Sequence, residues 1–398
     1  RCSPSGGPAD IHLVPRAAVV WDAGRITWVG PEADLPTDGV AGLDGEEHDA
    51  GGRLVLPGLV DCHTHLAFGG WRADEFSLRA RGASYLEILE SGGGIRSTMA
   101  STRAASEETL ADRARGFLRS MAELGVTTVE AKSGYGLSAA DEIKQLRVYE
   151  RLRDEPGLPR LVSTFLGAHV LPPEFEEASS YVSMLIEDLL PVIAAEGLAE
   201  FCDVFVEEGA FDAAEATRLL RAAAGHGLRA KLHVDQLHDV DGGRLAASVN
   251  AISADHLEYT SAAGMQAMAG AGVVAVSLPI ASLYLRQRPM DGRAFLDAGC
   301  PVAIATDFNP GSAPSYHLPF AMTLACTMNG LTPEEALKAA TLVAAKAIGR
   351  DGVTGSIDSG KRADFAVIDA ESVNHWLYHF RPNAAHRTFI AGTPFVPQ

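Results

Sequence analysis

The stretch LPGLVDCHTH, from Leu56 to His65, is an apolar run typical of a buried strand, and it ends in two histidines. Side chains alternate between the two faces of a strand, so His63 and His65 project from the same side with their imidazole rings close together. This geometry suits two interpretations, a shared metal ion or an ordinary pair of hydrogen-bonded histidines. The rest of the chain has to distinguish them.

The composition indicates a globular protein with a small-molecule partner. Its 398 residues are 47% hydrophobic, which is enough for a large core. The formal net charge of −18, from 33 Lys+Arg against 51 Asp+Glu, repels nucleic acid and anionic membrane surfaces. No run approaches the ~18 uninterrupted apolar residues of a membrane helix, and the N-terminus lacks a basic region followed by an apolar run. We therefore expect neither nucleic-acid nor membrane binding.

The cysteines predict a reducing compartment. Their number is odd, they are widely scattered, and no C-x-x-C pair occurs. Three of them lie in apolar runs, as reduced core cysteines usually do, which favours the cytoplasm. The five positions are Cys2, Cys62, Cys202, Cys300 and Cys326.

Eight short runs rich in Val, Ile, Leu, Ala and Phe predict strands that are covered on both faces. Between most of them lie helical patterns, with capping-box patterns at Asp212 and Thr332 and a helix-ending glycine at Gly197. This alternation, from about residue 53 to about residue 349, implies a (β/α)8 TIM barrel of the α/β class, with a doubly wound open sheet as the second alternative. The predicted strands are 53–62, 126–131, 160–168, 201–206, 229–234, 250–256, 272–278 and 301–307.

The two ends of the chain differ from this middle part. The segment AAVVWDAGRITWVG has two alternating runs around Ala23-Gly24, which predicts a hairpin with Trp21 and Trp28 as packing residues. More short strands with turn residues follow Gly352. Because each end is too short to bury a core alone, we expect residues 1–55 and 353–398 to form one small β-sandwich-like domain, with the barrel at 56–352.

Polar side chains that suit a metal follow several of the predicted strands. His63 and His65 end the first run, the fifth ends near His233, the sixth near His256 and the eighth near Asp307. A lone histidine after an apolar run is usually a hydrogen-bonded structural residue. In a (β/α)8 barrel, however, the carboxyl ends of all strands meet at the active-site face. Five such groups at one level are hard to explain by packing.

Several longer motifs carry a resemblance to the amidohydrolase superfamily of metal-dependent hydrolases. It rests on PGLVDCHTH, the later histidines, the aspartate after the eighth run and the closing segment GSIDSGKRADFAVID. More narrowly, the chain resembles the imidazolonepropionase family, which opens the ring of 4-imidazolone-5-propanoate to N-formimidoyl-glutamate in histidine degradation. The motifs for this are HTHLAFGGWR from His63, SGGGI from Ser91, EAKSGYGL from Glu130, FLGAHVLP from Phe165, HVDQ from His233 and ATDFNPGS from Ala305.

The resemblance implies a single zinc or iron ion bound by His63, His65, His233 and Asp307. Relatives with two metals often carry a modified lysine on strand four, and the run FCDVFVEEGAF has none. Two carboxylates at the end of that run could reach the site, but a salt-bridged or solvated role is favoured for them. They are Glu207 and Glu208.

The metal implies a mechanism. A water activated by the ion attacks the ring carbonyl. Asp307 takes the proton and passes it to the departing ring nitrogen, while His256 holds the attacking oxygen and stabilises charge. Many family members have a glutamate where this chain has Gln236, although glutamine also occurs. An amide cannot act as a base, so Gln236 is expected to hydrogen-bond the ring, and the proton shuttle is left to His256 and Asp307.

Substrate selection needs a partner for the propionate. Arg72 offers a planar fork for a carboxylate and Tyr135 a hydroxyl. The alternative for Arg72 is a local ion pair with Asp74 or Glu75. His169 is expected to face the ring; its alternative is a buried histidine bonded to a backbone carbonyl.

The stretch FNPGS is expected to touch ligand through Asn309, Gly311 and Ser312 by the resemblance; otherwise it is a turn after a strand. The glycine-rich stretch Ser91–Ile95 lacks the spacing of a phosphate-binding loop, and a mobile loop over the pocket is favoured. The resemblance also favours a homodimer.

Two rival functions share parts of this pattern. A deaminase of cyclic amidines, such as purines or pyrimidines, would have the same metal ligands but less need of a cation in the pocket, so Arg72 and Tyr135 argue against it. A non-catalytic relative that serves as an interaction protein would lack metal ligands, and here the set is complete.

Overall fold

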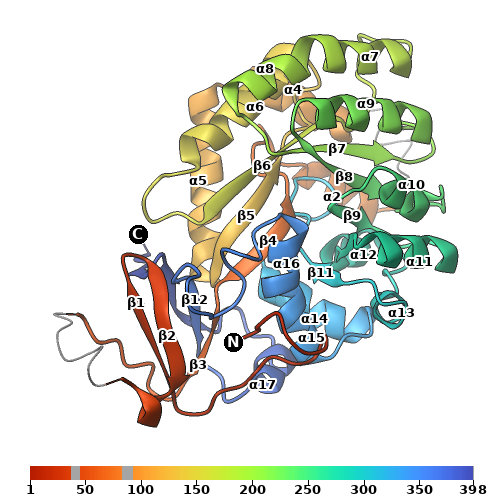
Figure 1. Ribbon diagram of the computed structural model, residues 1–398. Coiled ribbons are helices and arrows are strands. Elements are labelled where there is room, and N and C mark those ends of the chain that lie inside the picture. The colour runs from red at the N-terminus through yellow and green to blue at the C-terminus, as the bar shows by residue number, and fades with distance from the viewer. Residues whose placement is uncertain (37–44, 83–92, 398) are drawn as a thin grey trace.

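The computed structural model describes residues 1–36, 45–82 and 93–397, and its centre is a closed barrel of eight parallel strands (Figure 1). Each strand pairs with the next one along the chain, and a parallel bridge between Thr64, at the end of the first strand, and Phe308, in the segment after the last strand, closes the barrel. The predicted (β/α)8 barrel is confirmed. Its strands are β4 (Leu59–Thr64), β5 (Val126–Lys132), β6 (Arg160–Ala168), β7 (Phe201–Val206), β8 (Arg229–Val234), β9 (Ser253–His256), β10 (Val274–Ser277) and β11 (Val302–Ile304).

Helices cover the outside of the barrel, and their starts follow the sequence signals. The Asp212 side chain accepts hydrogen bonds from the amides of Ala214 and Glu215, and Thr332 forms a capping box with Glu335. The helices are α2 (Ala73–Ala80), α4 (Ile95–Ala104), α5 (Glu107–Glu123), α6 (Ala139–Leu152), α7 (Ala178–Met184), α8 (Leu190–Glu196), α9 (Ala213–Gly225), α10 (Gly242–Ser248), α11 (Ala262–Ala271), α12 (Pro279–Leu285), α13 (Gly292–Asp297), α14 (Leu318–Met328), α15 (Pro333–Lys338) and α16 (Ala344–Ala347).

Two of these helices are continued by π-helical turns, Leu185–Leu189 after α7 and Ala339–Val343 after α15. The first lies in a continuous helical segment, Ala178–Glu196, which by length and composition could cross a membrane. Its Leu185 and Leu189 are buried in the barrel core, however, while two acidic side chains, Glu187 and Asp188, are exposed in its middle. This is the packing of an amphipathic barrel helix.

The run Arg53–Cys62, predicted as one strand, is divided into two. β3 (Leu54–Pro57) pairs antiparallel with β12 (Phe365–Ile368) outside the barrel, and β4 begins only at Leu59. At Gly58, between them, the backbone passes so close to β5 that a Cβ atom would lie 2.2 Å from Thr127 Oγ1. Hydrophobic patterning does not distinguish one long strand from two that share a bend, so the prediction was wrong here.

Both ends of the chain contribute to a small β region beside the barrel (Figure 1). β1 (Ala17–Asp22) and β2 (Arg25–Pro31) form the predicted hairpin, and Trp21 packs against Phe365 and Phe389, with ring centroids 5.4 and 5.8 Å away. That the two ends fold as a unit divided at residues 55 and 353 stays a prediction. The other elements are the 3-10 turn η1 (Glu32–Asp34), α17 (Val373–Tyr378), β13 (Ala385–Ile390) and β14 (Thr393–Pro394), and sheet order is β14-β13-β12-β3.

The bend at Gly58 generates a stability prediction. Gly58→Ala forces a Cβ atom against the Thr127 side chain in a fully packed strand pair, and we expect the free energy of unfolding to fall by about 1–3 kcal/mol. Gly116→Ala is the matched control, because Gly116 lies exposed in α5 with no atom within 4 Å of the added Cβ, and should stabilise by about 0.5–1 kcal/mol. Urea unfolding measures both; equal stability of the two variants would contradict the account.

Candidate active site

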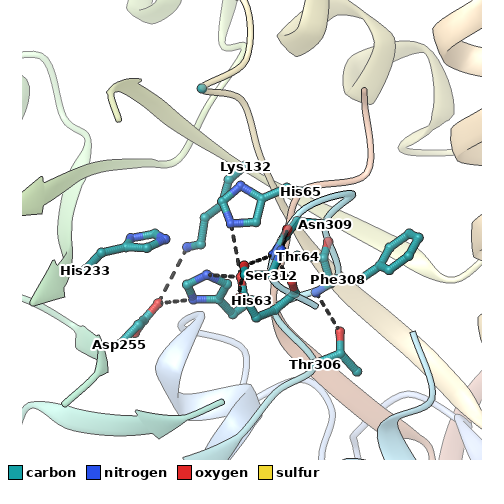
Figure 2. A network of polar contacts seen from close by, with 12 residues as sticks. His63, Thr64, His65, Lys132, His233, Asp255, Thr306, Phe308, Asn309 and Ser312 are labelled. Carbon is teal, nitrogen blue, oxygen red and sulfur yellow. Dashed lines mark hydrogen bonds and ion pairs between the residues drawn. The ribbon is translucent and has the colours of Figure 1, made fainter. Parts of the chain in front are cut away.

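Three histidines gather at the carboxyl ends of the barrel strands (Figure 2). His63 and His65, from the end of β4 and just after it, have ring centroids 5.3 Å apart, as the alternation of side chains along a strand predicts. His233 comes from β8, with its ring 4.5 Å from that of His63 and 5.8 Å from that of His65. All three side chains are buried.

Asp307 joins these histidines from the segment after β11. Its Oδ1 lies 3.4 Å from Nε2 of both His63 and His65. Backbone bonds fix this meeting: the Asp307 N–H donates to the His63 carbonyl at 3.0 Å, and the His65 N–H donates to the Phe308 carbonyl at 2.8 Å. Burial disfavours the charged carboxylate, but the two histidines outweigh it and hold the pKa of Asp307 well below its usual range.

The donor set fits a zinc or iron ion. Ligand atoms of His63, His65 and Asp307 all lie within 4.8 Å of one another, and so do those of His63, His233 and His256. The Nε2 atoms of His63 and His233 are buried and have no hydrogen-bond partner among the described residues. Unpartnered imidazole nitrogens that face a carboxylate are the ligands that such ions accept.

Two buried aspartates hold the opposite ring nitrogens. Asp255 Oδ2 lies 2.7 Å from Nδ1 of His63, and Asp203 Oδ1 lies 3.1 Å from Nδ1 of His233. A carboxylate only accepts, so each Nδ1 donates and each Nε2 presents a lone pair to the centre. Neither aspartate was predicted from the sequence, although a charged residue inside the apolar runs FCDVFV and NAISADH was a usable signal.

His256 stands at the end of β9, next to the three histidines. Its ring lies 5.4 Å from that of His233 and 5.9 Å from that of His63. His256 and Leu257 both adopt left-handed backbone conformations, with φ of 80° and 69°, which turns the chain sharply after the strand. Such strain in non-glycine residues persists only where the surroundings impose it, and it concentrates at functional sites.

Tyr135 and His169 form one wall of the site. The His169 ring is stacked on that of His65, with centroids 5.5 Å apart and planes 18° from parallel, and Tyr135 lies 5.6 Å from His65. His169 Nδ1–H donates to the Gly134 carbonyl at 3.0 Å. The bond to a backbone carbonyl, given as the alternative for His169, is therefore present, and it leaves Nε2 as an acceptor.

Arg72 lies at the edge of the site and is paired locally. Its Nε and Nη2 lie 2.9 and 2.8 Å from Glu75 Oε2, so Glu75 forms the ion pair considered from the sequence, while Asp74 is exposed. Glu75 Oε1 also accepts the Gly94 N–H at 2.7 Å. A Cβ atom at Gly311 would lie 2.1 Å from Arg72 Nη1, so only glycine leaves room for the guanidinium there.

Asn309 organises the loop after Asp307. Its Oδ1 accepts the N–H groups of Gly311 and Ser312, both at 2.8 Å, and its Nδ2 donates to the Asp307 carbonyl at 2.6 Å. The turn read directly from the residues is therefore present. Ser312 Oγ donates to Asp307 Oδ2 at 3.4 Å, which places its hydroxyl beside the carboxylate.

The remaining candidates lie on loops around the site. Gln236 is half-buried two residues after β8. Glu207 Oε2 accepts the Leu237 N–H at 2.8 Å and so fixes the loop after β8, whereas the Glu208 side chain is exposed. Both glutamates have the structural or solvated role that was favoured for them. Of the stretch Ser91–Ile95, the first two residues lie outside the described residues.

Comparison with known proteins identifies the class. The family model described as "Amidohydrolase family" matches residues 75–375, so the chain belongs to the amidohydrolases. A triazine hydrolase variant (TM-score 0.75, 18% identity, covering 96% of this chain and 90% of that one) and a zinc-containing adenosine deaminase from Xanthomonas campestris (0.67, 20%, 95% and 88%) share its fold.

Closer relatives narrow the family to the imidazolonepropionases, to which the chain belongs. The imidazolonepropionase of Geobacillus thermodenitrificans is 46% identical over 96% of this chain and 91% of its own length. That of Shouchella clausii is 44% identical over 96% and 86%.

The buried His169 generates a pH prediction. Burial, reinforced by the nearby His65, lowers its pKa to about 3 from the ordinary 6.5. The unfolded chain then binds the extra proton below about pH 6.5, so this histidine lowers stability as the pH falls. Between pH 7 and pH 5, chelator-treated wild type should lose about 2 kcal/mol more unfolding free energy than His169→Gln, which has no titrating ring. Urea unfolding at both pH values measures this; equal losses would contradict it.

Proposed function

We propose that this protein hydrolyses the ring of 4-imidazolone-5-propanoate to N-formimidoyl-L-glutamate in histidine degradation, with one zinc or iron ion per chain. The convergence of His63, His65, His233 and Asp307 on one buried centre carries the proposal. The family membership, at 44–47% identity to imidazolonepropionases, supports the choice of substrate. When bound, the ion would supply the Lewis acidity that lowers the pKa of an attacking water.

Proton transfer falls to Asp307 and His256. Asp307 is held ionised and can accept the proton of the water that adds to the ring carbonyl carbon. It then delivers that proton to the ring nitrogen as the carbon–nitrogen bond breaks. His256 is assigned to hold the attacking oxygen and to stabilise the developing negative charge. Gln236, whose amide cannot take a proton, is assigned a hydrogen bond to the ring.

Binding of the propionate is assigned to Arg72 and Tyr135. The Arg72 side chain is only 15% exposed, so its interaction with a second carboxylate is poorly screened by water. Burial raises the pKa of Tyr135 and keeps its hydroxyl protonated as a donor. His169 is assigned to contact the ring, and Asn309, Gly311 and Ser312 to line the other side of the substrate. A cation at the pocket favours a substrate that carries a carboxylate, and therefore this reaction over deamination of a cyclic amidine.

The proposal includes a cytoplasmic location, supported by the five free cysteines. The homodimer expected from the resemblance stays a prediction, as does the absence of nucleic-acid and membrane partners.

The decay of 4-imidazolone-5-propanoate ultraviolet absorbance tests the reaction, against a no-enzyme control that corrects for unaided decay. The metal-loaded protein should accelerate the loss, and Arg72→Ala should raise the apparent KM by about 10–100-fold, because a charge-assisted hydrogen bond contributes about 1.5–3 kcal/mol. Arg147→Ala is the matched control, since Arg147 pairs with Glu196 on the outer helices. No acceleration by a protein that contains metal would refute the assignment and direct the test to cyclic amidines.

Metal content tests the centre separately. Wild type should hold about one zinc or iron per chain, and His233→Ala should lose most of it, since three ligands hold an ion less tightly than four. His386→Ala, at an exposed position on β13, should keep the wild-type content. Elemental analysis after dialysis gives the stoichiometry; two ions per chain, or full retention by His233→Ala, would contradict the proposed ligand set.

A further inference from the structure

A fully buried lysine lies beside the metal site. Lys132, on β5, has its Nζ 2.8 Å from Glu130 Oε1, 2.9 Å from Asp203 Oδ2 and 3.6 Å from Asp255 Oδ2. The side chains of all four residues are 0% exposed. Figure 2 shows the lysine amine between His63 and His233, with an ion pair to Asp255. The proposed reaction gives this lysine no part.

Lys132 contacts both aspartates that hydrogen-bond the metal histidines. Asp203 uses Oδ2 for Lys132 and Oδ1 for Nδ1 of His233. Asp255 uses Oδ2 for both Lys132 and Nδ1 of His63. One ammonium group therefore holds both carboxylates that determine which ring nitrogen faces the metal position.

The ammonium fixes which oxygen of Asp203 faces His233. Lys132 Nζ donates to Asp203 Oδ2 at 2.9 Å, so Oδ1 is the oxygen that accepts from Nδ1 of His233 at 3.1 Å. A carboxylate held in this way leaves the Nε2 lone pair of His233 toward the metal position. Without Lys132 the carboxylate is free to rotate, and the hydrogen bond that orients His233 is weakened.

Asp203 depends on Lys132 more than Asp255 does. Asp255 also accepts the Ser253 hydroxyl at 2.7 Å, and Lys231 Nζ lies 3.9 Å away. For Asp203, Lys132 is the one lysine or arginine in ion-pair contact within the described part of the chain. We therefore expect loss of Lys132 to disturb His233 more than His63.

We propose that Lys132 is a positioning residue for the metal centre, which sets the ring tautomers of His233 and His63 through Asp203 and Asp255. This role rests on the proposed metal site and assigns Lys132 no contact with substrate. It requires that metal affinity, rather than fold stability alone, depend on the lysine.

Cobalt binding tests this role without using activity. Metal-free protein is titrated with Co²⁺ against a chromophoric chelator, and the visible spectrum reports the ligand geometry. Lys132→Met should bind Co²⁺ about 10–100-fold more weakly than wild type, the range expected for loss of a group that supports metal ligands. Lys338→Met is the matched control, because Lys338 is also buried but binds backbone carbonyls of Gly7 and Asp10. Affinity of Lys132→Met within about twofold of wild type would overturn the proposal.

A second pair of variants decides the matter if Lys132→Met does not fold. In Asp203→Asn, the lysine attracts the amide oxygen and turns the amide NH₂ toward His233, which imposes the wrong tautomer, so affinity should fall about 10–100-fold. In Lys132→Met/Asp203→Asn the amide is free to reverse and accept from Nδ1, so affinity should recover by about tenfold.

If Lys132 has only a structural role, a different result is expected. The double variant would then bind Co²⁺ no better than Asp203→Asn alone, and this result would overturn the proposal. Failure of wild type to bind Co²⁺ would instead refute the metal site itself, which separates the two failures. Circular dichroism of each variant establishes that it is folded.

Discussion

The closure of the barrel between β4 and β11 is the constraint on which the site depends. The Asp307 N–H donates to the His63 carbonyl, and the His65 N–H donates to the Phe308 carbonyl, so the end of β4 and the segment after β11 exchange backbone hydrogen bonds at the level of the proposed metal ligands. Below this level, Asp61 on β4 accepts both the N–H and the hydroxyl of Thr306. Residues 245 positions apart, Asp61 and Thr306, are thereby held within hydrogen-bonding distance, because a closed barrel makes its first and last strands neighbours.

This closure buries several aspartates away from water, and neighbouring polar and charged side chains offset the desolvation cost. Burial raises the pKa of Asp61 to about 7, whereas Asp203 and Asp255 stay ionised because cations lie against them. The Nε2 atoms of His63 and His233 are buried and have no hydrogen-bond partner among the described residues. A buried polar atom without a partner is costly in a folded protein, so these atoms indicate the position of the proposed metal better than any single distance does.

Much of this arrangement could be predicted from the sequence, and the limits have a physical cause. Alternation along a strand placed His63 and His65 on one side, and the barrel rule brought His233 and Asp307 to the same mouth. The pattern says which face a side chain takes but not which strand lies opposite it. Lys132 and its aspartates were therefore missed, since their pairing arises only when β5, β7 and β9 surround one interior. The bend at Gly58 was missed because it depends on contact with a neighbouring strand.

The most direct test of the central claim is a crystal structure of the metal-loaded protein with anomalous diffraction at the zinc and iron absorption edges. We expect one anomalous peak per chain, bonded to Nε2 of His63, His65 and His233 and to a carboxylate oxygen of Asp307, with Nδ1 of His63 and His233 still hydrogen-bonded to Asp255 and Asp203. A metal bonded through Nδ1 of these histidines, or located away from Asp307, would contradict it.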